Sequence, residues 1–250
     1  MRRPPEGTCR FPGRGEREAG QNREKEMSDP GALALFIRNP EPGAVKTRLA
    51  ATLGPDRAAR FYWECALIVM AKALRLPGME VFVFFRPPEG KARVEELIMS
   101  RFGDFEGRFI PAEGGNQGER MHHALENLAS SGFRRMFTLG TDSPTLPQEN
   151  LVKAARALES ADCVLGPTWS GGLYLFGARE PDERYFRNVS WSSGLELVQV
   201  FDNISSLGRK CALLPRWQDI DTPDDLDFLE GQIRQTDYRR LKELLHENRP

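Results

Sequence analysis

The sequence predicts an α/β protein whose mainly parallel sheet lies between two layers of helices. Short apolar runs alternate along the chain with longer segments in which apolar residues recur at helical spacing. Strands that alternate with helices imply right-handed crossovers, and therefore parallel pairing with helices on both faces. The chain has 250 residues, of which 40% are hydrophobic, and this suits one large domain with an ordinary buried core.

The expected elements follow one another without a long linker. The runs that we interpret as strands are residues 33–37, 81–85, 109–110, 136–139, 163–165, 173–176 and 212–214. The helical patterns cover residues 55–76, 91–101, 119–130, 148–158, 195–201 and 223–245. The strand at residues 173–176 falls outside the simple alternation, and residues 38–49 and 140–147 are expected to be loops.

The first 26 residues contain arginine, glutamate, glycine and proline but no apolar stretch. Such a segment cannot bury enough surface to fold, and it lacks the apolar region of a signal peptide. We therefore expect a disordered tail over residues 1–26 and a single domain over residues 27–250. We also expect translation to start at Met27, because the structured pattern begins just after it.

Charge and cysteine usage narrow the class of protein. The formal net charge is -1, so no global basic field points to nucleic acid. No apolar run approaches the roughly 20 residues of a membrane span. Three of the four cysteines, Cys65, Cys163 and Cys211, lie in apolar runs and form no C-x-x-C pair. We expect buried free thiols and a reducing compartment, the cytoplasm.

The segment after the first expected strand carries groups that suit a phosphate. In open α/β sheets ligands bind beyond the carboxyl ends of the strands. Gly43 lets the backbone approach a ligand closely, Lys46 and Arg48 add positive charge, and Thr47 adds a hydroxyl. The segment lacks the Walker A pattern, and a solvated basic turn is the alternative interpretation.

Three aspartates are candidate metal ligands. Asp142 follows the fourth of these strands and could bind a divalent cation that bridges diphosphate oxygens, although capping the next helix is the alternative. Thr222 and Pro223 read as the start of a helix, with Asp225 completing a capping box. Asp219 and Asp221 precede that cap, so either could be the second metal carboxylate.

Two glycine-rich segments are further candidates. Residues 114–121 enter a helix whose first turn could face an anion or a base, which makes Gly118, Glu119 and Arg120 candidates for nucleotide binding. The alternative for Glu119 is to complement the helix dipole.

The second segment, residues 166–177, could approach a sugar. Gly171 and Gly172 would allow close contact, and Trp169 could stack on a ring or simply pack. Trp191 heads the next helix, where Ser192 or Ser193 is expected to be the N-cap.

Six ordered segments resemble the motifs of a known bacterial family. Those motifs read P-x-P-G-x-V-K-T-R-L, G-E-R-M, D-S-P-x-L-P, G-P-x-x-D-G-G-Y-Y-L-I-G, W-S-T and D-x-D-T-P-x-D-L. Here they correspond to residues 40–49, 118–121, 142–147, 166–177, 191–193 and 219–226. Over residues 31–230 the chain thus resembles glycosyltransferase-like proteins, once grouped as a domain of unknown function, of the nucleotide-diphospho-sugar transferase (GT-A) superfamily.

The resemblance implies a GT-A-like three-layer α/β/α sandwich. It also implies a nucleotide near the loop after the first strand and a metal, Mg²⁺ or Mn²⁺, at Asp142. Our candidates for contact with the sugar are Ser170, Gly171, Gly172 and Trp191. Ser170 and Asn116 depart from the pattern, because the relatives usually have aspartate there. Each change removes a carboxylate from the expected site.

The leading hypothesis is a transferase that takes a sugar from a nucleotide-diphosphate sugar and passes it to a small-molecule acceptor. A metal on Asp142, with Asp219 or Asp221, would neutralise the leaving diphosphate, and Lys46 and Arg48 would add fixed positive charge. We therefore place Lys46 and Asp142 in the catalytic machinery.

The same residues are compatible with two alternative functions. The chain also resembles, more distantly, 2-phospholactate guanylyltransferase and the molybdenum-cofactor nucleotidyltransferases. Nucleotidyl transfer from a nucleoside triphosphate to a phosphate or hydroxyl acceptor is therefore the second hypothesis. Binding of a nucleotide sugar without turnover is the third, and Ser170 and Asn116 favour it.

Overall fold

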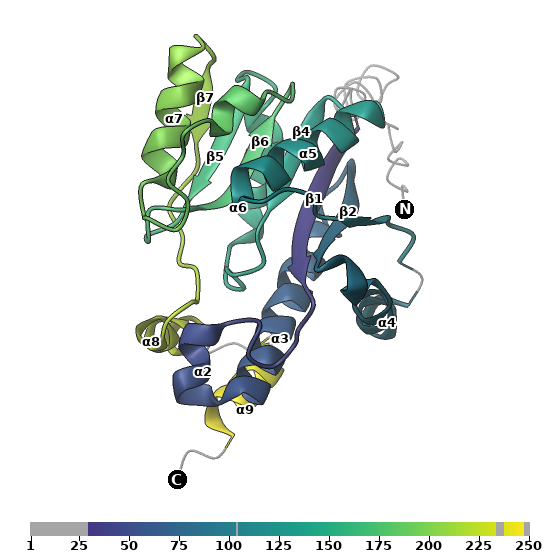
Figure 1. The fold of residues 1–250 in the computed structure, drawn as a ribbon, viewed down its shortest axis with the longest axis vertical. Helices are drawn as coiled ribbons and strands as arrows, with labels where there is room; N and C mark the ends of the chain where they lie inside the picture. Colours follow the sequence, from purple (N-terminus) through teal and green to yellow (C-terminus); the bar gives the residue numbers. More distant parts are fainter. Residues whose placement is uncertain (1–29, 104, 234–237, 248–250) are drawn as a thin grey trace, which may run out of the picture.

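The computed structural model describes residues 30–103, 105–233 and 238–247, and within them it confirms the predicted fold class. A seven-stranded sheet of order β3-β2-β1-β4-β6-β5-β7 carries helices on both faces, as Figure 1 shows. The expected tail over residues 1–26 and the expected start at Met27 lie outside the described residues. None of the helices in the described part of the chain has the length and apolar character that a membrane span requires.

Six of the seven strands run in the same direction. The strands are β1 (Gly31–Arg38), β2 (Met79–Arg86), β3 (Phe109–Pro111), β4 (Arg135–Leu139), β5 (Cys163–Pro167), β6 (Leu173–Ala178) and β7 (Cys211–Leu213). Strand β6 pairs antiparallel with both β4 and β5. The short connection over residues 168–172 explains this, because a parallel crossover needs a dozen or more residues. The run that broke the expected alternation is therefore the antiparallel strand.

Helices cover both faces of the sheet, and others gather beyond one end of it. The helices are α2 (Thr47–Leu53), α3 (Pro55–Ala73), α4 (Lys91–Phe102), α5 (Gln117–Ser130), α6 (Gln148–Ala157), α7 (Glu196–Ser206), α8 (Pro223–Gln232) and α9 (Arg239–His246), with the short 3-10 helices η1 (Pro88–Gly90) and η2 (Glu183–Phe186). Leu33, Leu35 and Ile37 of β1 pack in one core cluster with α3, α4 and α6. The alternate residues Ala32 and Ala34 pack in another with α5 and α7, so β1 is buried on both faces.

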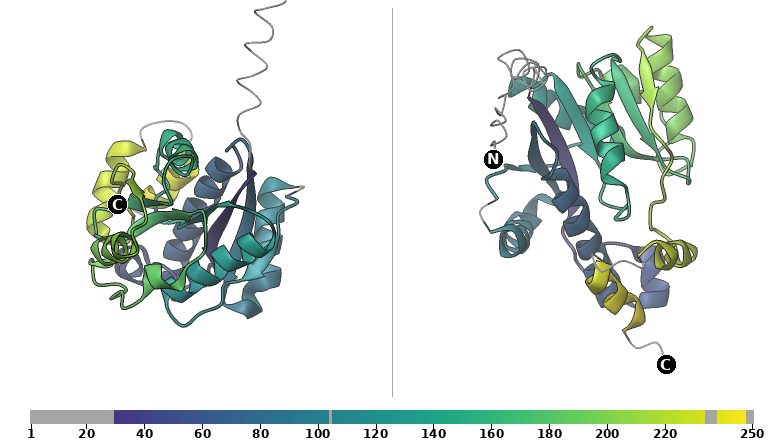
Figure 2. Two further views of the ribbon diagram at one scale, coloured as in Figure 1. Left: turned by 90° about the horizontal axis from the view of Figure 1, so that it is seen from above. Right: turned by 180° about the vertical axis from the view of Figure 1, so that it is seen from behind.

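A third apolar cluster lies beyond the carboxyl end of β1. It joins α2, α3, α8 and α9, which gather at one end of the molecule in Figure 2. Its fully or almost fully buried members include Leu49 of α2, Leu229 of α8 and Leu245 of α9. Ile220, on the segment before α8, also belongs to this cluster and fixes that segment beside the sheet edge.

The structure corrects two expectations. Residues 38–49 are not all loop, because α2 begins at Thr47. The alanines and leucines of α2 favour a helix, and burial of Leu49 holds it against the third cluster. Gly54, at φ 78, follows its end. The single helix expected over residues 223–245 is two helices, α8 and α9. A straight helix of that length would extend roughly 35 Å, whereas both helices fold back onto the same cluster.

The three cysteines in the described part of the chain are free thiols, as expected. Cys65 and Cys163 are buried, and Cys211 is half-buried. Burial raises the pKa of Cys163 and of Cys211 to about 12, so both remain protonated at neutral pH. These thiols are packing groups.

Candidate active site

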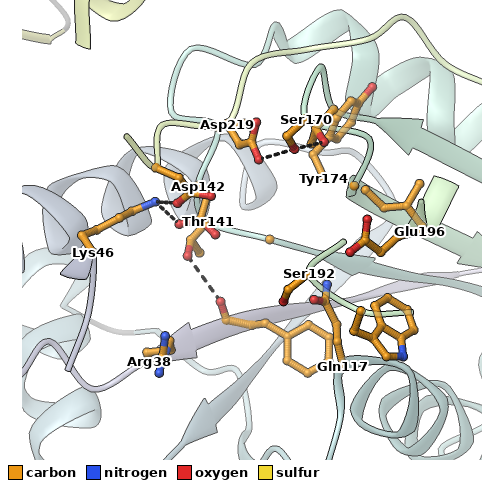
Figure 3. A pocket seen from close by; sticks show the side chains of 18 of the residues that line it. Arg38, Lys46, Gln117, Thr141, Asp142, Ser170, Tyr174, Ser192, Glu196 and Asp219 are labelled. Carbon is orange, nitrogen blue, oxygen red and sulfur yellow. Dashed lines mark hydrogen bonds and ion pairs between the residues drawn. The ribbon is translucent and has the colours of Figure 1, made fainter. Parts of the chain in front are cut away.

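A cavity of about 900 Å³ opens at the carboxyl ends of the strands. This volume lies within the range of small-molecule sites. Residues from both halves of the chain line it, and Figure 3 shows ten of them by name. The cavity is thus at the edge where the sequence placed the candidate residues.

The ammonium group of Lys46 lies between two carboxylates on one side of this cavity. Nζ donates to Asp142 Oδ1, to Asp221 Oδ1 at 2.7 Å and to the carbonyl oxygen of Ile220 at 2.6 Å. Only 3% of the Lys46 side chain is exposed. Burial alone would lower its pKa, but the two carboxylates outweigh this effect and hold the pKa of Lys46 above its usual value. Lys46 therefore carries a permanent charge.

The backbone of Lys46 is strained. Its φ of 46° and ψ of 44° lie in the left-handed region, which costs a non-glycine residue about 1–2 kcal/mol. Such a conformation persists only where the surroundings enforce it, and it concentrates at functional sites. Here the three hydrogen bonds of the ammonium group and the start of α2 at the next residue supply that enforcement.

The segment over residues 219–221 brings Asp219 and Asp221 close to Asp142, although they are far from it in the sequence. Side chains of an extended segment alternate between its two sides. Ile220 points into the third apolar cluster, and its two neighbouring aspartates line the cavity. The backbone N–H of Ile220 donates to the carbonyl oxygen of Asp142 at 2.9 Å. One carboxylate oxygen of Asp225 accepts from the N–H groups of Asp221 and Thr222, which pins the segment and confirms the predicted capping box.

Asp219 differs from the other two aspartates because one of its carboxylate oxygens is buried without a hydrogen-bond partner among the described residues. Its Oδ2 accepts a hydrogen bond from Ser170 at 2.9 Å, and Ser170 also shares a hydrogen bond of 2.8 Å with Thr168. Its Oδ1 is buried without a hydrogen-bond partner among the described residues. Burial, and then the charges of Asp221 and Asp142, hold the pKa of Asp219 above its usual value. A cation at this point would relieve the crowding of negative charge.

The residues present fit a divalent cation. Within the described ranges, no three His, Cys, Asp or Glu side chains are already gathered as a metal site. Mg²⁺, however, takes only one or two carboxylates and fills its shell with phosphate and water. The unpartnered oxygen of Asp219 suits that need, with Asp142 or Asp221 as second ligand. The metal itself stays a prediction.

Three arginines lie on another side of the cavity. Arg38 ends β1, Arg86 ends β2 directly beside it, and Arg120 is on α5. All three line the cavity. Burial, and then the charges of Arg86 and Arg38, lower the pKa of Arg120. Only Arg120 was a predicted site residue; the signal for the other two is a charged residue that closes an otherwise apolar strand.

Glu196 is another cavity residue that the sequence analysis did not predict. It is buried in the first turn of α7, lines the cavity, and accepts a hydrogen bond from the N–H of Ser193 at 2.8 Å. Figure 3 shows its carboxylate pointing into the cavity. In the sequence it looks like an ordinary first-turn glutamate.

The structure corrects the predicted N-cap of this helix. Ser192 and Ser193 are not the N-cap, since α7 begins after Leu195, whose N–H donates to the Ser193 hydroxyl at 3.2 Å.

The structure brings most of the predicted site residues to the cavity. Those that line it are Lys46, Thr47, Arg48, Arg120, Asp142, Ser170, Gly172, Trp191, Asp219 and Asp221. Trp169 also lines it, with 61% of its surface exposed and the Arg216 guanidinium 5.7 Å from its ring centre.

Four predicted residues do not line this cavity: Gly43, Gly118, Glu119 and Gly171. Gly43 forms a turn at φ 80 in open space. A Cβ on Gly118 would meet Trp191 at 2.6 Å, and one on Gly171 would meet the Gly194 carbonyl oxygen at 2.0 Å, so both glycines serve close packing. Glu119 accepts from the N–H of Gly115 at 2.7 Å, at the start of α5.

Comparisons with known proteins identify the family of the chain and the likeness of its fold. A family model described as "Uncharacterized protein conserved in bacteria (DUF2064)" matches residues 69–193. No curated protein sequence is detectably similar to the chain.

Two solved structures illustrate the likeness in fold. A protein from Desulfovibrio desulfuricans G20, provisionally described as a nucleotide-diphospho-sugar transferase, shares 29% identity; the match covers 88% of this chain and 95% of that one, with a TM-score of 0.79. The 4-diphosphocytidyl-2C-methyl-D-erythritol synthase of Anaerococcus prevotii DSM 20548 shares 13% identity over 82% of this chain and 97% of that one, with a TM-score of 0.52, which is a likeness of fold alone.

Proposed function

The chain belongs to the bacterial family DUF2064, and from this premise we propose that it is a metal-dependent transferase whose donor is a nucleotide-diphosphate sugar. One observation carries the proposal. Lys46, Asp142, Asp219 and Asp221 converge in one cavity at the carboxyl ends of the strands. The similar structure from Desulfovibrio desulfuricans, provisionally described as such a transferase, supports the choice of donor.

The residues of this side would act on the diphosphate of the donor. Lys46 holds a fixed positive charge that needs no reorganisation as the leaving group gains negative charge. Thr47 and Arg48, at the start of α2, line the same part of the cavity and would contact phosphate oxygens. On Asp219 with Asp142 or Asp221, a divalent cation such as Mg²⁺ or Mn²⁺ would supply Lewis-acid stabilisation of the leaving diphosphate.

The part of the cavity next to Asp219 would receive the sugar and the acceptor. Ser170, Gly172 and Trp191 line it with hydroxyl, backbone and aromatic groups. Glu196 is the carboxylate best placed to take a proton from an acceptor hydroxyl. One of its oxygens is held by the N–H of Ser193, which fixes the direction of the carboxylate.

Nucleotidyl transfer is the second candidate, and the arginines favour it. Arg38, Arg86 and Arg120 bring three further positive charges into the cavity, which suits a triphosphate better than a diphosphate. The acceptor would attack the α-phosphate, and pyrophosphate would leave.

Product analysis separates the candidates. The protein is first screened by thermal shift against nucleotide sugars and nucleoside triphosphates with Mg²⁺ or Mn²⁺, because binding raises the apparent stability. Ligands that bind are then incubated with a panel of small-molecule acceptors. A released nucleoside diphosphate supports sugar transfer, and pyrophosphate supports nucleotidyl transfer. A thermal shift without any product, together with activity gained in Ser170→Asp, supports binding without turnover.

A further inference from the structure

The arginine side of the cavity has a charge pattern that the proposed sugar transfer does not use. Arg38 and Arg86 occupy the same register position on neighbouring parallel strands, where strands lie about 4.8 Å apart. Arg120 reaches the same region from α5 and donates to the carbonyl oxygen of Gly114 at 3.0 Å. Like charges opposite one another on adjacent strands are destabilising. The fold nevertheless concentrates three of them at one wall.

No carboxylate of the described residues pairs directly with these three arginines. None of the three arginines forms an ion pair within the described ranges. Glu119, whose charge acts on Arg120, makes its hydrogen bonds to the N–H of Gly115 and the side chain of Asn116. Among the described residues, the charge of Glu119 offsets part of the charge of Arg120, but no carboxylate pairs with any of the three guanidinium groups, which line the cavity.

This arginine wall is distinct from the carboxylate wall, which Asp142, Asp219 and Asp221 form. The arginines come from β1, β2 and α5, whereas the aspartates follow β4 or precede α8. Figure 3 shows Arg38 on the opposite side of the cavity from Asp219 and Ser170. A group held by the arginines would thus not share the ligands of a cation at Asp219.

We infer that Arg38, Arg86 and Arg120 form an anion subsite that holds a phosphate group of a substrate by direct contact with guanidinium groups. Guanidinium presents a planar fork of donors that matches phosphate oxygens in pairs. The phosphate is either the terminal phosphate of a nucleoside triphosphate or that of a phosphorylated acceptor. The inference rests on the proposed function only in taking this cavity as the substrate site.

The test is binding of inorganic tripolyphosphate, measured by calorimetry in the presence of EDTA. We expect Arg38→Gln, Arg86→Gln and Arg120→Gln each to weaken binding by roughly tenfold to a hundredfold, because each removes a charged phosphate contact. Arg86→Lys keeps the charge but loses the fork, so its affinity should fall between those of the wild type and Arg86→Gln. Arg93→Gln is the matched control, since Arg93 lies on the exposed surface of α4 and pairs with Glu96.

The melting temperature of each variant shows whether a loss of binding comes from unfolding. Arg86→Gln relieves repulsion and should melt at or above the wild-type temperature. Wild-type protein that does not bind tripolyphosphate would overturn the inference. Equal affinity of all variants for tripolyphosphate would also overturn it. So would a loss of affinity in Arg93→Gln as large as the loss in the three cavity variants. Because no turnover is needed, this result is independent of whether a transfer product is ever found.

Two further ligands identify the source of the phosphate. If it is the terminal phosphate of a nucleotide, Arg86→Gln weakens binding of one or more of ATP, GTP, CTP and UTP. If it belongs to the acceptor, Arg86→Gln binds these nucleotides normally but loses affinity for glucose 1-phosphate, a simple phosphate monoester. Unchanged affinity for all five compounds counts against a substrate subsite.

Discussion

The carboxylate wall and the arginine wall of the cavity differ in how far the protein neutralises its own charge. Lys46, Asp142 and Asp221 form a closed set of ion pairs, although they lie 96 and 175 residues apart in the chain. The arginines are close in space yet have no carboxylate partner among the described residues. The carboxylate wall is thus preorganised by the fold, whereas the arginine wall gains its counter-charge from a ligand. Substitutions on the first wall should therefore disturb catalysis, metal binding and stability, whereas those on the second should weaken the binding of a ligand.

The largest expected effect is that of Asp142→Asn on transfer. Loss of this charge leaves Lys46 with one carboxylate and removes a candidate cation ligand, so kcat/KM should fall on the order of 100-fold. Steady-state assays with the donor identified by the thermal-shift screen provide the measurement. Asp202→Asn, on the exposed face of α7, is the control that should keep full activity. Equal activity in both variants would remove Asp142 from the machinery.

Ser170→Asp tests how strongly the carboxylate wall attracts a cation. A carboxylate at position 170 would lie against Asp219, which the serine now contacts at 2.9 Å. Metal affinity rises with the number of charged ligands, so we expect Mn²⁺ to bind about tenfold more tightly. Calorimetry with Mn²⁺ measures this, and Ser170→Asn is the uncharged control. If both variants bind Mn²⁺ equally, charge at this position does not govern metal affinity.

The raised pKa of Asp219 predicts a pH dependence of stability in metal-free protein. Its pKa is higher in the folded state, so between the ordinary aspartate value of 3.8 and the raised value the folded protein holds more protons than the unfolded chain. Stability from this group is complete below pH 3.8 and is lost as the pH rises through the folded pKa. Urea denaturation of wild type and Asp219→Asn across this range should show the loss in the wild type alone. Parallel curves contradict the prediction.

The smallest effect concerns the backbone of Lys46. Lys46→Ala and Lys46→Gly both delete the ammonium group, but only glycine adopts φ 46 without penalty. The glycine variant should be about 1 kcal/mol more stable than the alanine variant. Chemical denaturation compares the two, and a more stable alanine variant would mean that this backbone relaxes once the ion pairs are gone.

The sequence predicted the strands and most helices because apolar periodicity survives in each segment separately. It also placed Lys46 and Asp142 at one edge, since the carboxyl ends of parallel strands meet there. It could not show that Lys46 occupies the space between two aspartates, because that contact depends on how the segment before α8 crosses the sheet. The alternation of Asp219, Ile220 and Asp221 was visible, but without the third apolar cluster nothing said which side faces the cavity.

The residues and the helix that the sequence analysis did not predict were missed for similar reasons. Arg38 and Arg86 are adjacent only because β1 and β2 pair in register, which a strand's own pattern does not reveal. Helix α2 is short and carries a single buried leucine, so its pattern is too weak to separate from a loop. Glu196 resembles any acidic residue in a first helical turn, and only the packing of α7 turns it inward.

Ile220 has a consequence for how the protein is made. Its N–H donates to Asp142 and its carbonyl oxygen accepts from Lys46, so a residue from the last fifth of the sequence holds this side of the cavity together. During synthesis the sheet can form first, as the N-terminal part of a chain generally does. The cation side of the pocket is complete only after this isoleucine leaves the ribosome, so prematurely terminated chains would carry a sheet but no working centre.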